Sequence, residues 1–553
     1  MSSWQDLCNA RKRAQVAALP KHWLIDLPPD DVRDVRAVPR HLAALLSPRE
    51  LDITDTTDVD RLLLNLRTAV WSAVEVTTAF YKRAVVAQQL TNCLTEIFID
   101  RALARAKEVD DYLKATGRPV GPLHGLPISL KDQFPLKGLE TIMGYAGWIG
   151  RYADADCVLV EILHEQGAVP FVRTNVPQTL MWGETYNHVF GRTTHPFNRA
   201  MTPGGSSGGE GALIALRGSP LGVGTDIGGS VRIPSAFCGL YGLRPSYARL
   251  PYANAVNSAE GQESIASVLG PMAGSLAGVR VFTQAIVDAQ PWRRDPARRA
   301  QGVAVGRPHP PVRRAMEIVK AALEKAGHTV IDWENHRHLE LYEVAERVFA
   351  ADDAHDFLTE CARSGEPLIQ TMSPETDAHE YALDEPFART IVGERRHLSV
   401  YELWQLHKQK RDLRKSHLDH WEATVARTRT GRPVDAIISP VAPYTACPHG
   451  CNSYVVPFGA ARFAFTDAFY TTMTNTLDYT TSVFPVTCAD AELDKAEPPH
   501  AFYNHEDEAV YKLYDPQLFH GLPVGLQLIG RTLEEEGVIA MTEVVDKALK
   551  AMH

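Results

Sequence analysis

The chain of 553 residues lacks any long apolar run. No stretch of about 18 consecutive apolar residues occurs, so the sequence predicts no transmembrane segment. The first 25 residues, MSSWQDLCNARKRAQVAALPKHWLI, carry charges where a secretory signal peptide needs an apolar core. We therefore expect a cytoplasmic protein.

Cysteine is also scarce, with eight residues and no regular spacing. This pattern excludes a disulfide framework and fits a reducing compartment. Cys447, His449 and Cys451 lie close together in the segment CPHGC. Because no second Cys/His pair lies nearby, we expect no metal there.

Basic residues do not predominate, since 57 Lys and Arg face 67 Asp and Glu, for a formal net charge of -10. Phosphate binding requires a basic surface, so nucleic acid is not an expected partner. A hydrophobic content of 45% and a charged content of 22% are ordinary for a globular protein with a large core. Without internal repeats or low-complexity linkers, one large domain fits better than several.

The order of periodic segments predicts an α/β fold. Residues 60–116 have helical spacing, and residues 121–134 predict a strand between loops. Residues 154–177 and 312–333 each predict a helix, a glycine turn and a strand. Two further short strands are expected at residues 435–440 and 521–530.

Residues 203–245 are rich in glycine and serine, yet apolar residues between them exclude a flexible linker. A phosphate loop is disfavoured because the Gly-Lys-Ser/Thr ending is absent and Glu210 would repel phosphate. The segments 204–208 and 205–209 match the G-x-S-x-G pattern of a nucleophile elbow. A Ser-His-Asp hydrolase, with candidates such as Asp435 and His449, therefore stays an alternative.

A second form of nucleophilic catalysis fits the segment TDIGGS. Two glycines allow consecutive backbone N–H groups to converge on an oxyanion, and Ser230 ends the loop. These N–H groups belong to Ile227, Gly228, Gly229 and Ser230. Lys131 lies in the apolar segment GLPISLKDQF, where burial would favour its neutral form and allow it to act as a base. The alternative is that Lys131 pairs with Asp132 at the surface.

Three segments together resemble the amidase signature family. GLPISLKD resembles the lysine motif, PGGSSGGEGA the bridging-serine motif, and GTDIGGSVRIPSAFCGLYGLRP the nucleophile motif. The two serine motifs follow Lys131 at intervals of 75 and a further 24 residues. The amino-acid sequence of these segments most resembles that of fungal acetamidase-type amidases and fatty acid amide hydrolases.

The resemblance implies a Ser-cisSer-Lys triad, with Lys131 as the neutral base, Ser206 as the bridging residue on a cis peptide bond, and Ser230 as the nucleophile. It also implies supporting roles for nearby residues, and an acyl site beside residues 180–182. The supporting residues are Ser207, Asp226 and Arg232, and the acyl-site residues are Leu180 and Met181, followed by Trp182.

The implied fold is a mixed twisted sheet with helices on both faces. We expect an amidase signature domain at 60–548, with its catalytic core at 120–250, preceded by a helical or extended arm at 1–59. The segment 292–309 looks shorter than the fungal pattern, which puts local folding and pocket shape in doubt.

The implied activity is hydrolysis of linear amides through an acyl-serine intermediate, without metal or cofactor, in a homodimer. One alternative is the glutaminase subunit of a tRNA-dependent amidotransferase, which needs a partner chain. Another is a binding protein that kept the fold but lost catalysis.

Overall fold

The computed structural model describes residues 3–29, 31–36, 45–290, 308–369, 372, 397–428, 430–450, 468, 470–502 and 505–552. Within these residues one mixed sheet has the strand order β1-β3-β2-β4-β6-β5-β8-β9-β7. Strand β2 is parallel to both β3 and β4, and the other neighbours are antiparallel. The strands are β1 (Leu94–Ile97), β2 (Pro127–Lys131), β3 (Val169–Thr174), β4 (Leu221–Asp226), β5 (Tyr241–Arg244), β6 (Val268–Ala273), β7 (Ile437–Pro440), β8 (Thr481–Cys488) and β9 (Pro523–Ile529).

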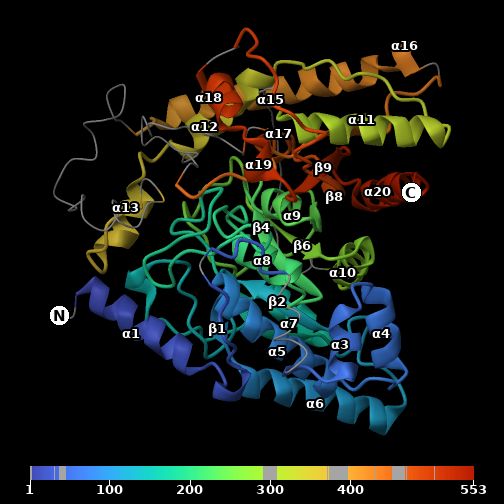
Figure 1. Cartoon of the computed structure of the whole chain (residues 1–553). Helices are drawn as coiled ribbons and strands as arrows, with labels where there is room; N and C mark the ends of the chain where they lie inside the picture. Colours follow the sequence, from blue (N-terminus) through green and yellow to red (C-terminus); the bar gives the residue numbers. More distant parts are fainter. Residues whose placement is uncertain are drawn as a thin grey trace.

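The sheet runs through the middle of the molecule, between N-terminal helices at one end and C-terminal helices at the other (Figure 1). The longer helices are α1 (Trp4–Ala17), α3 (Pro48–Asp55), α4 (Val59–Arg67), α5 (Ala73–Thr91), α6 (Ile99–Thr116), α7 (Val158–Glu165), α8 (Gly208–Ala215), α10 (Leu276–Asp288), α11 (Pro310–Lys325), α12 (His338–Phe349), α13 (His355–Ala362), α15 (Val400–Ala423), α18 (His505–Leu513) and α20 (Glu535–Lys550). The shorter ones are α9 (Arg232–Phe237), α16 (Val425–Thr428), α17 (Thr472–Leu477) and α19 (Pro516–Phe519), with 3-10 turns η1 (Lys21–Trp23) and η2 (Ala146–Trp148).

Local sequence signals explain where the central elements begin and end. Helix α5 starts at a capping box in which Ser72 and Glu75 bond to each other's backbone N–H groups. Helix α6 ends at Gly117, whose φ of 67° is the left-handed conformation that glycine favours. Strands β2, β3 and β4 are buried along their whole length, as parallel strands covered on both faces are.

The structure confirms the α/β fold and most predicted elements, with two differences. The strand expected after α11 is absent, because residues 328–333 are largely exposed and pair with no strand. Strands β1, β5, β6 and β8 were not predicted from the sequence, since they are short or interrupted by Gly and Pro. The shortened segment at 292–309 lies almost wholly outside the described residues.

Candidate active site

The site begins at the carboxyl ends of two parallel neighbours, β2 and β4. Residue pairs Ser129–Gly222 and Leu130–Val223 set their register. Because parallel strands end at the same edge of a sheet, Lys131 at the end of β2 lies beside the loop that follows Asp226. This is where an open α/β sheet commonly carries its ligand site.

Lys131 is fully buried and is bonded to two hydroxyl groups. Its Nζ atom lies 2.8 Å from Ser206 Oγ and 2.7 Å from Thr225 Oγ1. Burial lowers the pKa of Lys131 from 10.5 to about 7, against the charges of Asp226 and Glu210, which raise it. The amine is therefore available in its neutral form near neutral pH.

The surface pair of Lys131 and Asp132, considered as an alternative, is wrong. Asp132 is itself buried and lies 3.5 Å from the Arg173 guanidinium, while it also accepts from the Met143 N–H at 3.3 Å. Adjacent residues of a strand point to opposite faces, so the two side chains cannot meet.

The serine pair lies next to Lys131 and to the Ser230 loop at once. The peptide bond between Gly205 and Ser206 is cis, as the resemblance implied. Ser207 donates its N–H to the Ser230 carbonyl at 3.2 Å, and its hydroxyl lies 3.4 Å from both the N and the O of Thr225. Gly205 is required here because a Cβ atom would lie 2.4 Å from the Trp182 carbonyl oxygen.

Ser230 is the most exposed of the three predicted triad residues, at 8% against 1% for Ser206 and 0% for Lys131. Its hydroxyl is hydrogen-bonded to none of the described residues. The preceding Gly229 has a φ of 133°, and a Cβ there would lie 2.3 Å from Thr471 Oγ1. Glycine thus allows the sharp turn that presents Ser230.

The predicted oxyanion loop needs one correction. Gly229 donates its N–H to Asp226 Oδ1 at 2.9 Å, so this group is already engaged. The N–H groups of Ile227, Gly228 and Ser230 bond to none of the other described residues. These three are the donors left for an oxyanion.

Asp226 and Arg232 form a buried ion pair beneath the loop. Arg232 Nη2 and Nε lie 2.8 and 2.9 Å from the two Asp226 oxygens, the bidentate geometry that Arg favours. Asn475 Nδ2 donates to Asp226 at 2.7 Å. Burial would raise the pKa of Asp226, but Arg232 and Asn475 outweigh it and hold the pKa well below its usual range. The pair keeps both charges and anchors the loop to α17.

Leu180 and Met181 lie where an acyl group could be recognised. Both are buried, and they share an apolar cluster with Met473 against which the partly buried Ile227 packs. Trp182 belongs to a different cluster, with Tyr186. Ile227 of the predicted oxyanion loop thus packs against the cluster that contains Leu180 and Met181, while the Trp182 carbonyl oxygen lies against Gly205 beside the serine pair.

Several contacts of the site carried no recognised signal in the sequence. Thr225, Gln133 and Glu210 fall inside or beside the three motifs, and their polar side chains in buried segments could have identified them. Thr471 and Asn475 could not be found in this way, because they lie about 240 residues from Arg232 in an ordinary segment.

The alternative Ser-His-Asp site is not assembled by the described residues. His449 Nδ1 lies 2.7 Å from Glu184 Oε1, and the exposed Asp435 lies 3.6 Å from Arg432. Neither contacts Ser230. No cluster of metal-ligating side chains occurs in the described ranges, and Cys451 lies outside them.

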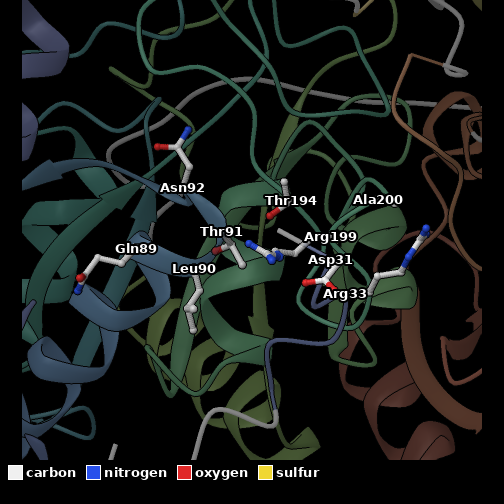
Figure 2. Close-up of a pocket in the computed structure, with 9 residues that line it drawn as sticks. All are labelled: Asp31, Arg33, Gln89, Leu90, Thr91, Asn92, Thr194, Arg199 and Ala200. Atoms are coloured by element: carbon white, nitrogen blue, oxygen red, sulfur yellow. The ribbon is translucent and has the colours of Figure 1, made fainter. Parts of the chain in front are cut away.

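A cavity of about 470 Å³ lies elsewhere, between the end of α5 and the loops that carry Asp31 and Thr194 (Figure 2). It is lined by polar side chains that include Arg199, and none of the three predicted triad residues lines it.

Among the described residues, no helix is both long enough and apolar enough to span a membrane.

Known proteins resemble this chain over nearly its whole length. The Amidase family model matches residues 75–539. An acetamidase of Emericella nidulans is 41% identical over 99% of this chain and 98% of its own, and an acetamidase of Aspergillus oryzae is 41% identical over 99% of both. A solved structure of a fatty acid amide hydrolase has a TM-score of 0.85 and 31% identity, and covers 99% of this chain and 95% of that one. The chain therefore belongs to the amidase family, as a hydrolase with a single amidase-signature domain.

Proposed function

We propose that the chain hydrolyses small linear carboxylic amides through an acyl-Ser230 intermediate, with Lys131 and Ser206 as the proton relay. The observation that carries this proposal is the 2.8 Å contact between the buried Lys131 amine and the Ser206 hydroxyl, next to Ser207, whose backbone N–H donates to the Ser230 backbone carbonyl. A serine needs a base to become a nucleophile, and a neutral lysine can act as one.

The proposed steps move protons along this row of groups. Lys131 accepts the Ser206 proton while Ser206 accepts the Ser230 proton, and the freed Ser230 oxygen attacks the amide carbonyl carbon. The free N–H groups at residues 227, 228 and 230 stabilise the oxyanion, and each donor contributes about 3 kcal/mol in the transition state. Ser206 then protonates the leaving nitrogen as the C–N bond breaks. Water hydrolyses the ester by the reverse relay.

The apolar neighbours of the loop favour an uncharged acyl group. Leu180, Met181 and Ile227 would adjoin the substrate carbon chain, and two relatives that match over 99% of this chain are named acetamidases. We infer in addition a homodimer in the cytoplasm. The described cysteines, all free thiols, suit a reducing compartment.

Two measurements on the purified chain test this function. Acetamide, benzamide and glutamine are compared as substrates, and a fluorophosphonate probe is mapped by mass spectrometry. We expect hydrolysis of the first two without a partner chain, and an adduct on Ser230 that Ser230→Ala abolishes and Ser235→Ala retains. Activity on glutamine alone, only with a partner, would favour an amidotransferase subunit; no adduct on Ser230 would refute the mechanism.

A further inference from the structure

A second buried ionisable side chain lies beneath Lys131 and has no part in the relay. Glu210, in the first turn of α8, is fully buried. Its Oε2 accepts from Ser129 Oγ at 2.5 Å, and its Oε1 accepts from Thr174 Oγ1 at 3.0 Å. No basic side chain of the described residues forms an ion pair with it.

The register of the sheet places this carboxyl beside Lys131. Thr174 on β3 is the direct cross-strand partner of Lys131, and Ser129 precedes Lys131 by two residues on the same face of β2. Both hydrogen-bond partners of Glu210 are therefore neighbours of Lys131 on that face of the sheet. The carboxyl and the amine interact electrostatically across this short gap.

The third strand of this region leaves room for the carboxyl. Gly222 on β4 pairs with Ser129, and a Cβ atom at Gly222 would lie 1.9 Å from Glu210 Oε2. Any larger residue would displace the carboxyl. Glu210 is thus enclosed by β2, β3 and β4, which hold its carboxyl beside Lys131.

The partners of Glu210 suit both of its protonation states. A hydroxyl can donate to a carboxylate or rotate to accept from a protonated acid, and Ser129 has a further partner in Ser219 Oγ at 3.0 Å. The equally buried Glu366 has one hydroxyl partner, Ser364 at 3.3 Å, but it differs because it also accepts from the Ala146 N–H at 2.6 Å and the Gln178 amide at 3.0 Å, which only donate. Glu210 is held by groups that tolerate a change of charge.

We propose that Glu210 is a positioning residue whose charge tunes how strongly Lys131 holds the proton that it takes from Ser206. This inference rests on the proposed function of Lys131 as the base. An ionised carboxyl stabilises the Lys131 ammonium, and a protonated one leaves the neutral amine free to accept a proton.

The surrounding charges leave this coupling undisturbed. Burial raises the pKa of Glu210, whereas Ser129, Thr174 and the Lys131 charge lower it, so the carboxyl ionises most readily while Lys131 carries its proton. The ionisable groups that act on this pair are Cys93 beside Glu210 and Asp226 beside Lys131. Since the Arg232 ion pair keeps Asp226 charged, Glu210 is the acidic neighbour of Lys131 that can change charge near neutral pH.

The test is the pH dependence of Ser230 phosphonylation by a fluorophosphonate, in which the serine oxygen displaces fluoride from phosphorus, followed from pH 5 to 9 with the adduct mapped by mass spectrometry. In the native chain we expect a half-maximal rate near the Lys131 pKa of about 7. Glu210→Gln removes the charge but keeps the shape, so the midpoint should move to lower pH by roughly one unit. At pH 5.5–6 this variant should react up to about 10-fold faster than the native chain, although its plateau falls because the base is weaker.

Two more variants separate this coupling from a merely structural role. Thr174→Val removes one hydrogen bond that favours the ionised carboxyl, so it should shift the midpoint in the same direction by less. Glu366→Gln, a matched buried glutamate away from Lys131, should leave the midpoint in place even if stability falls. Equal midpoints in Glu210→Gln, Thr174→Val and the native chain would overturn the proposal, whereas a native chain that forms no Ser230 adduct would instead overturn the proposed function on which it rests.

Discussion

Two buried cationic side chains flank the Ser230 loop, and their partners differ. Arg232 faces the Asp226 carboxylate in a bidentate pair, whereas the hydrogen bonds of the Lys131 amine within the described part of the chain go only to the hydroxyls of Ser206 and Thr225. A buried cation keeps its charge when a carboxylate compensates it, and loses its proton readily when only hydroxyls do. Equal burial therefore yields a rigid anchor on one side of the loop and a titratable base on the other.

The lysine side of this comparison predicts the largest effect. Lys131→Met removes the base, and Lys131→Arg keeps a cation that cannot be deprotonated. Both variants should lower kcat for amide hydrolysis by about 10²–10⁴-fold, the range of general-base catalysis. The measurement is steady-state kinetics on a simple aliphatic amide.

Lys410 on α15 offers a matched control for these variants. It is also a buried lysine whose pKa burial lowers to about 8, and it donates to the Ser264 carbonyl away from the Ser230 loop. Lys410→Met should keep its kcat within a few-fold of the native value. Near-native activity of Lys131→Arg would show that a neutral amine is not required.

The arginine side predicts a loss of stability. Arg232→Met leaves the Asp226 carboxylate buried without its ion-pair partner, which should lower the free energy of unfolding by about 3–5 kcal/mol. Urea denaturation followed by far-UV circular dichroism measures this loss. The exposed pair of Arg337 and Glu340 provides the contrast, because Arg337→Met should change stability by no more than about 1 kcal/mol. Similar losses in both variants would contradict the anchoring role.

The fold was predictable where local signals were strong. Strand β2 was predictable because an apolar run lies between glycines and prolines. Helix α6 was predictable because its helical spacing of apolar residues ends at Gly117. Strands β5 and β6 escaped because YGLR and VLGPMA carry Gly and Pro that weaken a strand signal. Residues 328–333 have a strand-like composition, but they pair with no other strand.

The candidate site was predictable only where its residues are contiguous in motifs. Lys131, Ser206 and Ser230 could be named because each lies in a segment of unusual composition. The engagement of the Gly229 N–H by Asp226 depends on a backbone φ of 133°, which no local pattern specifies. The contacts of Arg232 with Thr471 and Asn475 depend on how α17 packs against the loop, which is a tertiary property.

The smallest effect concerns the stability of the lysine side itself. In the unfolded chain Lys131 titrates at its ordinary pKa of 10.5, while in the folded chain its pKa is about 7. As the pH falls from 10.5 to 7, the unfolded chain binds a proton on Lys131 that the folded chain does not bind. Lys131 therefore lowers the free energy of unfolding progressively over this range, and by a constant amount below pH 7. Lys131→Met removes this term, while the Ser206 hydroxyl loses its bond to the amine and the Thr225 hydroxyl keeps only its bond to Gln133. We expect the variant to be more stable than the native chain at pH 7 by about 2 kcal/mol, and this advantage to shrink towards pH 10. Thermal unfolding of both proteins at several pH values measures it, and parallel pH dependences from pH 7 to 10 would mean that Lys131 is charged in the folded chain.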